Sequence, residues 1–209
     1  MKVSAAKENI LKKIRQALSN QVPVPFPLSE GNESVYHIPK QELAVTFAEK
    51  FSSLMGRFSY CLDETELAEQ LKDLFAAKKI SNVYCREKEL KSLLQTKGIE
   101  LNATDVKSCQ ASITGCEKLI ARTGSIVMSS AQQSGRTVSV YAPIHICIAY
   151  ADQLVADIKD ALLDIKNKYP QMPSLVTLAT GPSRTADIEK TLIVGVHGPK
   201  EVFCFLVER

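Results

Sequence analysis

The stretch IHICIAY at residues 144–150 decides the fold that the sequence predicts. It is apolar almost throughout, whereas a strand with one face in water would alternate apolar and polar residues. A run of this kind is typical of a strand covered on both faces, as in the parallel sheets of α/β proteins. We therefore expect residues 144–150 to lie inside a parallel sheet.

Strand-like and helix-like segments alternate on both sides of this run. A helical stripe of apolar residues begins at Leu43, and Asp152 is expected to open a helix that carries Leu154, Val155 and Ile158. The other strand-like segments are RFSYCL (57–62), SNVYC (81–85), ASIT (111–114), GSIVMS (124–129), SLVTLAT (174–180) and EVFCFLVE (201–208). The alternation predicts a three-layer α/β domain with a mostly parallel sheet over residues 40–209.

Residues 1–39 read as a separate N-terminal segment. Ile10, Leu11 and Ile14 fall on one face of a helix ringed by lysines, and a proline-rich linker follows. Such a basic amphipathic helix could dock on a membrane surface or on a partner. The alternative is a terminal helix that covers this domain or its copy in a homo-oligomer.

Composition excludes several classes of function. The 26 basic and 23 acidic residues leave a net charge of +3, which is too small an excess to indicate a nucleic-acid-binding protein. No apolar run reaches the roughly 18 residues of a membrane span, and no secretory signal is visible, so we expect a cytoplasmic protein with reduced cysteines. The six cysteines show no C-x-x-C spacing, and we expect neither a metal nor a cofactor.

The stretch TGPSRTADIE at residues 180–189 carries the first candidate site. It follows a predicted strand, and open α/β sheets bind ligands beyond the carboxyl ends of their strands. Ser183 and Thr185 are good N-cap residues for a short helix, whose free N–H groups together with Arg184 would bind an anion. The predicted ligand-binding residues here are Thr180, Gly181, Ser183, Arg184 and Thr185. Asp187 and Glu189 allow the opposite interpretation. In it, Arg184 pairs with Asp187, the charged groups of the loop neutralise one another, and no anion binds.

His197, in GVHGP at 195–199, is the second candidate. Histidine transfers protons near neutral pH, and small neighbours suit an exposed side chain, so His197 and Asp187 are the predicted catalytic residues. A Ser183–Asp187–His197 hydrolytic triad is conceivable by residue type. A structural histidine is the alternative.

Two further segments are expected to join the same cleft. Thr123, Gly124 and Ser125 place two hydroxyl groups and a flexible backbone before a strand, and His145 could point into a cleft. Alternatively, residues 123–125 form an ordinary tight turn, and His145 is buried against a backbone carbonyl.

Together, TGPSRTADIE with GVHGP, ARTGSIVM and APIHICIAY resemble the LUD-domain family in its lactate-utilisation branch. The resemblance covers roughly the second half of the chain. This chain departs from the family's pattern at Arg122, where an acid is usual, and at Ala142, where a proline is usual.

The resemblance implies a fold like that of the NagB/RpiA/CoA-transferase superfamily. It also implies a non-redox subunit of a cytoplasmic system that oxidises L-lactate to pyruvate, with the iron–sulfur clusters on partner subunits. A small carboxylate or phosphorylated ligand would then bind near Arg184 and His197. The alternative is a free-standing CoA-transferase- or isomerase-like enzyme for a phosphorylated or CoA-linked substrate.

Overall fold

Within the N-terminal segment, the structure describes a helix. The computed structural model describes residues 5–19, 41–185 and 193–208, and the chain divides into two units, 1–37 and 38–209. In the first unit, α1 (Ala5–Ser19) is helical as predicted, and its Ile10, Leu11 and Ile14 side chains are exposed. The second unit contains the features described below.

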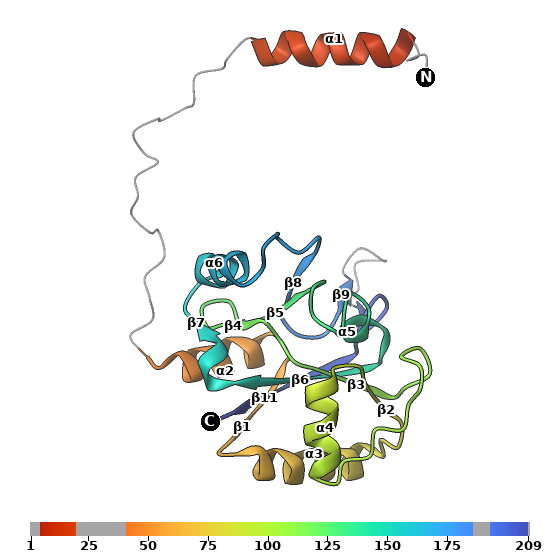
Figure 1. The fold of residues 1–209 in the computed structure, drawn as a ribbon, viewed down its shortest axis with the longest axis vertical. Helices are drawn as coiled ribbons and strands as arrows, with labels where there is room; N and C mark the ends of the chain where they lie inside the picture. The colour runs from red at the N-terminus through yellow and green to blue at the C-terminus, as the bar shows by residue number, and fades with distance from the viewer. Residues whose placement is uncertain (1–4, 20–40, 186–192, 209) are drawn as a thin grey trace. The chain divides into compact units, whose positions relative to one another are not determined.

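A five-stranded parallel sheet forms the centre of the second unit (Figure 1). Its strands, in spatial order, are β1 (Arg57–Cys61), β11 (Glu201–Val207), β6 (Ile144–Tyr150), β3 (Ala111–Thr114) and β2 (Val83–Cys85). β6 is the middle strand, and residues 145–149 are buried. The expected parallel sheet, with 144–150 inside it, is confirmed.

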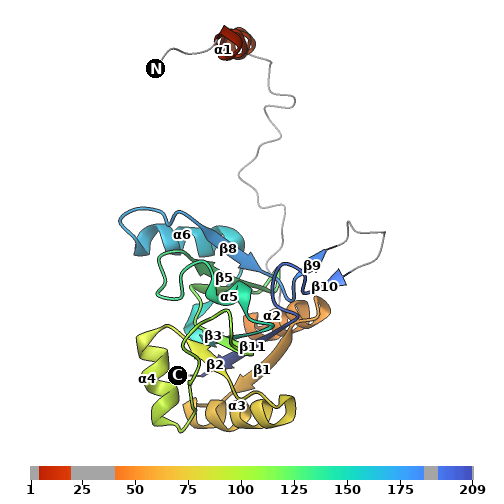
Figure 2. The same ribbon diagram turned by 90° about the vertical axis from the view of Figure 1, so that its right-hand side faces the viewer.

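Helices cover both faces of this sheet, as predicted. On one face lie α3 (Glu64–Lys78) and α4 (Lys88–Thr96), which pack leucines against Ile113, Ile146 and Phe205 (Figure 2). On the other face α2 (Leu43–Ser53) inserts Phe47 and Phe51 against β6 and β11. Each apolar stripe thus meets a strand that is apolar on both sides.

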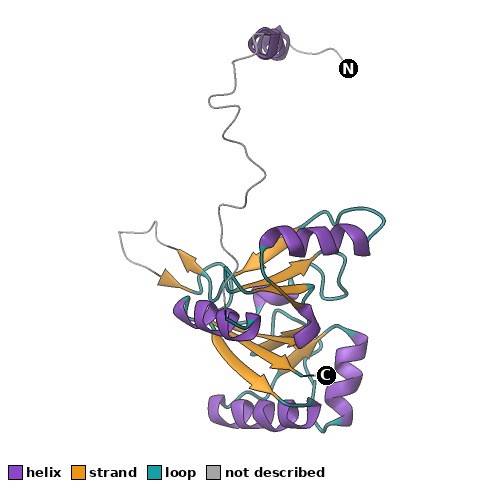
Figure 3. Ribbon diagram, turned by 90° about the vertical axis from the view of Figure 1, so that its left-hand side faces the viewer, coloured by secondary structure: helices purple, strands orange, loops and turns teal. Residues whose placement is uncertain are grey.

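A second, antiparallel-rich sheet covers the same face of the parallel sheet as α2, because its Leu119, Ile126 and Met128 pack in one cluster with β6, β11 and α2 (Figure 3). The sequence pattern did not separate this sheet from the first. It has the order β7 (Leu154–Val155), β4 (Lys118–Ile120), β5 (Ser125–Ser129) and β8 (Val176–Ala179). Its outer face is covered by α6 (Ile158–Lys168). The remaining elements are a 3-10 turn (Ala151–Gln153), a short helix α5 (Val138–Tyr141) and a hairpin of β9 (Arg184–Thr185) and β10 (Ile193–Val194).

Two local predictions are wrong. The helix expected at Asp152 begins at Ile158, because Leu154 and Val155 pair with β4 as a strand and Asp157 caps the helix instead. The helix expected to begin after Ser183 does not begin there, because Arg184 and Thr185 pair with β10; the residues that would follow a cap at Thr185 lie outside the described residues. In both places strand pairing overrides the local capping signal.

Over the part of the chain that the structure describes, no helix combines the length and the apolar character needed to cross a membrane.

Candidate functional site

A cleft of about 440 Å³ lies at the amino ends of β6 and β11, and we call it the amino-edge cleft. Pro143 and Lys200, which directly precede the two strands, line it together with Tyr141 of α5. The wall also includes Val140 of α5 and the segment Gly195, Val196, His197 and Gly198. The predicted residue His197 is therefore exposed at a cavity, beside an exposed lysine.

The side-chain chemistry of this cleft favours an anion. Among the described residues that line it, Lys200 is a cation, His197 and Tyr141 offer polar groups, and none is a carboxylate. Gly195 has a φ of +80°, and a Cβ at this position would lie 2.2 Å from Cγ of Lys200. The glycine therefore lets the lysine stem pack on the backbone at the cleft wall.

The turn at Thr123–Ser125 and the turn at Thr180–Gly181 lie side by side. β5 and β8 pair Ile126 with Ala179, and this register brings the two turns together at the end of the ladder. Both glycines press on the end of α2, because a Cβ on Gly124 would lie 2.5 Å from the Phe51 nitrogen and one on Gly181 would lie 2.4 Å from the Leu54 oxygen. The two motifs therefore have a steric role in holding α2.

Ser183 connects these turns to the amino-edge cleft. Its N–H donates to the Pro199 carbonyl at 2.9 Å, and its carbonyl accepts from the Gly195 N–H at 2.8 Å. Arg184 is exposed on β9, opposite Val194, and is not one of the residues that line the cleft. Asp187 and Glu189 lie outside the described residues.

From the sequence, the loop after β8 was expected at the carboxyl edge of the parallel sheet. It does not lie there. β8 belongs to the second sheet, and Gly181 contacts the segment that leads into β1. Of the predicted site residues, His197 lines the amino-edge cleft and Ser183 is hydrogen-bonded to two residues beside it, whereas Arg184 is not part of its lining.

His145 is separate from this cleft. It is 1% exposed, and its Nε2 atom shares a hydrogen bond of 2.9 Å with the Thr114 hydroxyl. Burial lowers the pKa of the imidazole to about 4, so the ring is neutral at pH 7.

Acid is expected to destabilise the protein through His145. In the unfolded chain His145 has a pKa near 6.5, whereas in the folded chain its pKa is about 4. Between these two pH values the unfolded state binds a proton that the folded state does not, so stability is lost as pH falls through this range. From pH 7.5 to pH 5 this linkage amounts to about 2 kcal/mol. Urea unfolding at both pH values should show the loss in the natural protein and a smaller loss in His145→Gln; equal losses would contradict this assignment.

A second cleft of about 440 Å³ lies at the opposite edge of the sheet, and we call it the carboxyl-edge cleft. Glu87 follows β2, Gly115 and Cys116 follow β3, and Asp152 and Gln153 follow β6. Sequence reasoning missed this cleft, although Glu87 stands two residues after the end of the predicted strand SNVYC. Examination of every loop that follows a strand would have found it.

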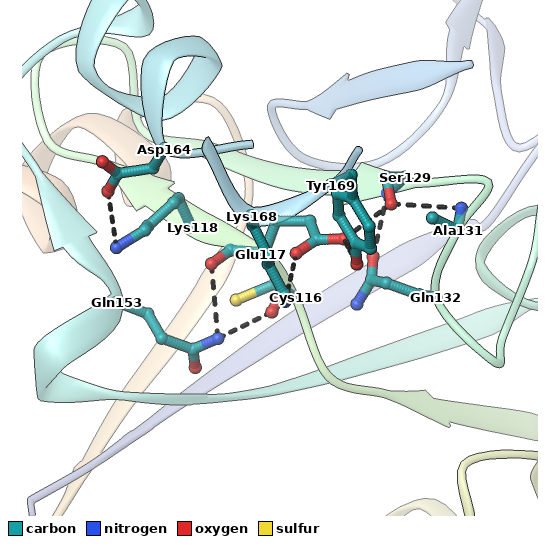
Figure 4. Close-up of polar contacts among 10 residues, drawn as sticks. All are labelled: Cys116, Glu117, Lys118, Ser129, Ala131, Gln132, Gln153, Asp164, Lys168 and Tyr169. Atoms are coloured by element: carbon teal, nitrogen blue, oxygen red, sulfur yellow. Dashed lines mark hydrogen bonds and ion pairs between the residues drawn. The ribbon is translucent and has the colours of Figure 1, made fainter. Parts of the chain in front are cut away.

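Glu117 is the centre of a buried polar network, the Glu117 cluster, which Figure 4 shows. Its carboxylate accepts hydrogen bonds from Ser129 (2.6 Å), Lys168 (2.8 Å) and Tyr169 (2.8 Å). Burial raises the pKa of this carboxyl, but the three donors outweigh burial and leave the pKa below its usual value. Because every partner is already engaged, we assign the cluster a structural role in fastening the end of α6 to the second sheet.

Over residues 5–19, 41–185 and 193–208, no group of three or more His, Cys, Asp or Glu side chains could hold a metal ion. All six cysteines are buried and free, and burial raises the pKa of the Cys61 and Cys85 thiols to about 11.

Arg122, the residue at which the chain departs from the expected pattern, has a clear structural partner. Its guanidinium forms two 2.8 Å hydrogen bonds with the carboxylate of Asp157, the N-cap of α6. The pair also accounts for the lowered pKa of Asp157. Arg122 therefore helps to hold α6 rather than to line the amino-edge cleft.

Comparisons with known proteins place these features in context. The family model of the LUD domain matches residues 44–207. A lactate utilization protein C of Bacillus licheniformis is 34% identical over 110 residues, which are 51% of this chain and 46% of that protein. The lactate utilization protein C of Bacillus subtilis is 33% identical over 111 residues, 52% of this chain and 46% of that protein. The chain thus spans about half the length of these curated relatives.

A solved structure shares the fold. The crystal structure of a DUF162 family protein from Deinococcus radiodurans superposes with a TM-score of 0.59 at 17% identity, over 79% of this chain and 96% of that one. At this identity the likeness supports the fold alone.

Proposed function

Because the chain belongs to the LUD domain family, we propose that it is a component of a lactate-utilisation system and binds a small carboxylate in the amino-edge cleft. The names of its relatives suggest the metabolic role. The observation that carries the binding proposal is the pairing of Lys200 and His197 in one cleft whose described lining holds no acid.

The chemistry of a 2-hydroxy acid suits these two side chains. The Lys200 ammonium would pair with the carboxylate, and the His197 imidazole would hydrogen-bond the neighbouring hydroxyl. Gly195 and Gly198 add no side chain, so the ligand can approach the backbone.

The division of labour in the system is part of the same proposal. We infer that this chain binds the carboxylate in the cytoplasm and that partners carrying iron–sulfur clusters remove the electrons. The buried cysteines support this inference, because iron binds thiolates and burial keeps the thiols of Cys61 and Cys85 protonated.

Substitution of Lys200 is expected to weaken the binding of L-lactate. In isothermal titration calorimetry, Lys200→Ala should lose about 10- to 150-fold in affinity, since a charge-assisted contact contributes about 1.5–3 kcal/mol. Lys166→Ala, which removes an exposed lysine of α6, is the matched control and should bind as the natural protein does. Lactamide, which lacks the negative charge, should bind weakly to every variant.

Other outcomes would overturn the proposal. Equal affinity for lactate and lactamide, or unchanged binding by Lys200→Ala, would show that the cleft does not recognise a carboxylate. Stabilisation by a CoA ester or a sugar phosphate, without any response to lactate, would favour the transferase- or isomerase-like alternative. Reconstituted lactate oxidation by cluster-bearing partners should depend on this chain, and Lys200→Ala should slow it.

A further inference from the structure

The amino-edge cleft carries apolar side chains that carboxylate binding alone leaves in water. Val140, Tyr141 and Val196 are 40%, 54% and 46% exposed, and all three line the cleft together with the exposed Pro143. We call these four residues the apolar wall. Exposed apolar side chains gathered beside a few polar groups in one cleft are typical of a small-molecule site. An apolar group on the bound ligand would therefore cover this wall.

Backbone hydrogen bonds hold the apolar wall next to the cation of the cleft. The Pro143 carbonyl accepts from the N–H of Lys200 at 2.8 Å and from the N–H of Glu201 at 3.2 Å. These bonds join the start of β11 to the segment 140–143, which supplies three of the four wall residues. The stem of Lys200 also packs on Gly195, directly before the fourth wall residue. The positive charge and the apolar wall therefore belong to one cleft whose two sides are joined by the fold.

Lactate is too small to cover the apolar wall. When its carboxylate pairs with Lys200 and its hydroxyl with His197, only a methyl group is left to contact apolar side chains. The cleft volume of about 440 Å³ lies in the range of sites that hold larger organic ligands. A 2-hydroxy acid with an aromatic or branched side chain presents the same two polar groups and removes more of the wall from water.

Tyr141 is the wall residue best suited to select such a ligand. Its ring is the largest apolar surface in the wall, and it lies on α5, which the buried Val138 fastens to the domain. Aromatic rings also attract one another in offset or edge-to-face contacts, beyond the effect of buried area. We propose that the amino-edge cleft prefers 2-hydroxy acids with an aromatic or branched apolar side chain over lactate, and that Tyr141 provides the preference. The preference rests on the proposed function, because Lys200 must hold the carboxylate of either ligand.

Phenyllactate is the probe that tests this preference. In isothermal titration calorimetry of the full chain, it should bind about tenfold more tightly than lactate, as expected for the burial of one aromatic side chain. Tyr141→Ser should bring the ratio of the two affinities close to one. Val196→Ser, on the other side of the cleft, should lower the ratio as well, and it tests the preference where Tyr141→Ser fails to fold. Tyr60→Ser removes an exposed tyrosine of β1 that does not line the cleft, so this matched control should keep the ratio.

Two further variants separate the preference from carboxylate binding itself. Lys200→Ala should weaken the binding of both acids, because they share one site, whereas Tyr141→Phe should keep the preference because it keeps the ring. Equal affinity of the natural protein for the two acids, or tighter binding of lactate, would overturn the preference and leave the proposed carboxylate site intact. Phenyllactate binding that is unchanged in Lys200→Ala would overturn it too, since this acid would then lie elsewhere. Failure of both acids to bind would contradict the proposed function, and the preference would fall with it.

Discussion

Gly124→Ala is expected to destabilise the protein by about 3–5 kcal/mol, the sum of a strained backbone and an overpacked contact. Gly124 has a φ of +60°, which disfavours any residue with a Cβ. The added carbon would also lie 2.5 Å from the backbone nitrogen of Phe51, in a helix that cannot move aside without disturbing the core. Urea unfolding followed by circular dichroism measures the loss.

Gly98→Ala provides the matched control. Gly98 also has a positive φ, of +74°, but the nearest atom to its Cβ would be the Lys72 Nζ at 3.6 Å, the mobile end of an exposed side chain. Strain acts there without a backbone clash, and a loss of about 1 kcal/mol is expected. Equal losses in the two variants would show that the turn does not press on α2.

Glu117→Ala is the second large change, with an expected loss of about 2–4 kcal/mol as a buried carboxylate that accepts three hydrogen bonds is removed. The variant leaves the hydroxyl groups of Ser129 and Tyr169 without their acceptor. Lys168 is 59% exposed and can return to water, which limits the loss. Asp164→Ala breaks the ion pair between Asp164 of α6 and Lys118 of β4, in which the carboxylate is 46% exposed, and should cost less than about 1 kcal/mol.

The contribution of Glu117 should depend on pH in a defined direction. Its folded pKa is depressed below 4.5, so its stabilisation is present above the unfolded pKa and is lost as pH falls through the folded pKa. The difference between the natural protein and Glu117→Gln should therefore shrink between pH 7 and pH 3. A difference that stays constant in urea unfolding over this range would show that charge plays no part.

The sequence predicted the fold better than the sites. Hydrophobic periodicity located β6 and the helices on both faces, because burial on two sides requires a continuous apolar run. Capping signals were less reliable, since the tendency of Ser183 to start a helix was overruled by the pairing of Arg184 and Thr185 with β10. His197 and the Gly-Pro turns could be recognised as candidates from their residue types. The residues that surround them in space could not be predicted, because they come from segments that are distant in the sequence.

What the sequence by itself determined is the family, the parallel sheet and the existence of chemically special turns, because these depend on patterns within a few residues. Tertiary structure alone decided that β8 joins a second sheet, that the special turns meet at the amino edge and that four ordinary acids share the carboxyl-edge cleft. Glu87 and Glu117 look like any surface glutamate in the sequence. Their burial arises from segments that are distant in the chain, and burial is what changes the electrostatics of a carboxylate.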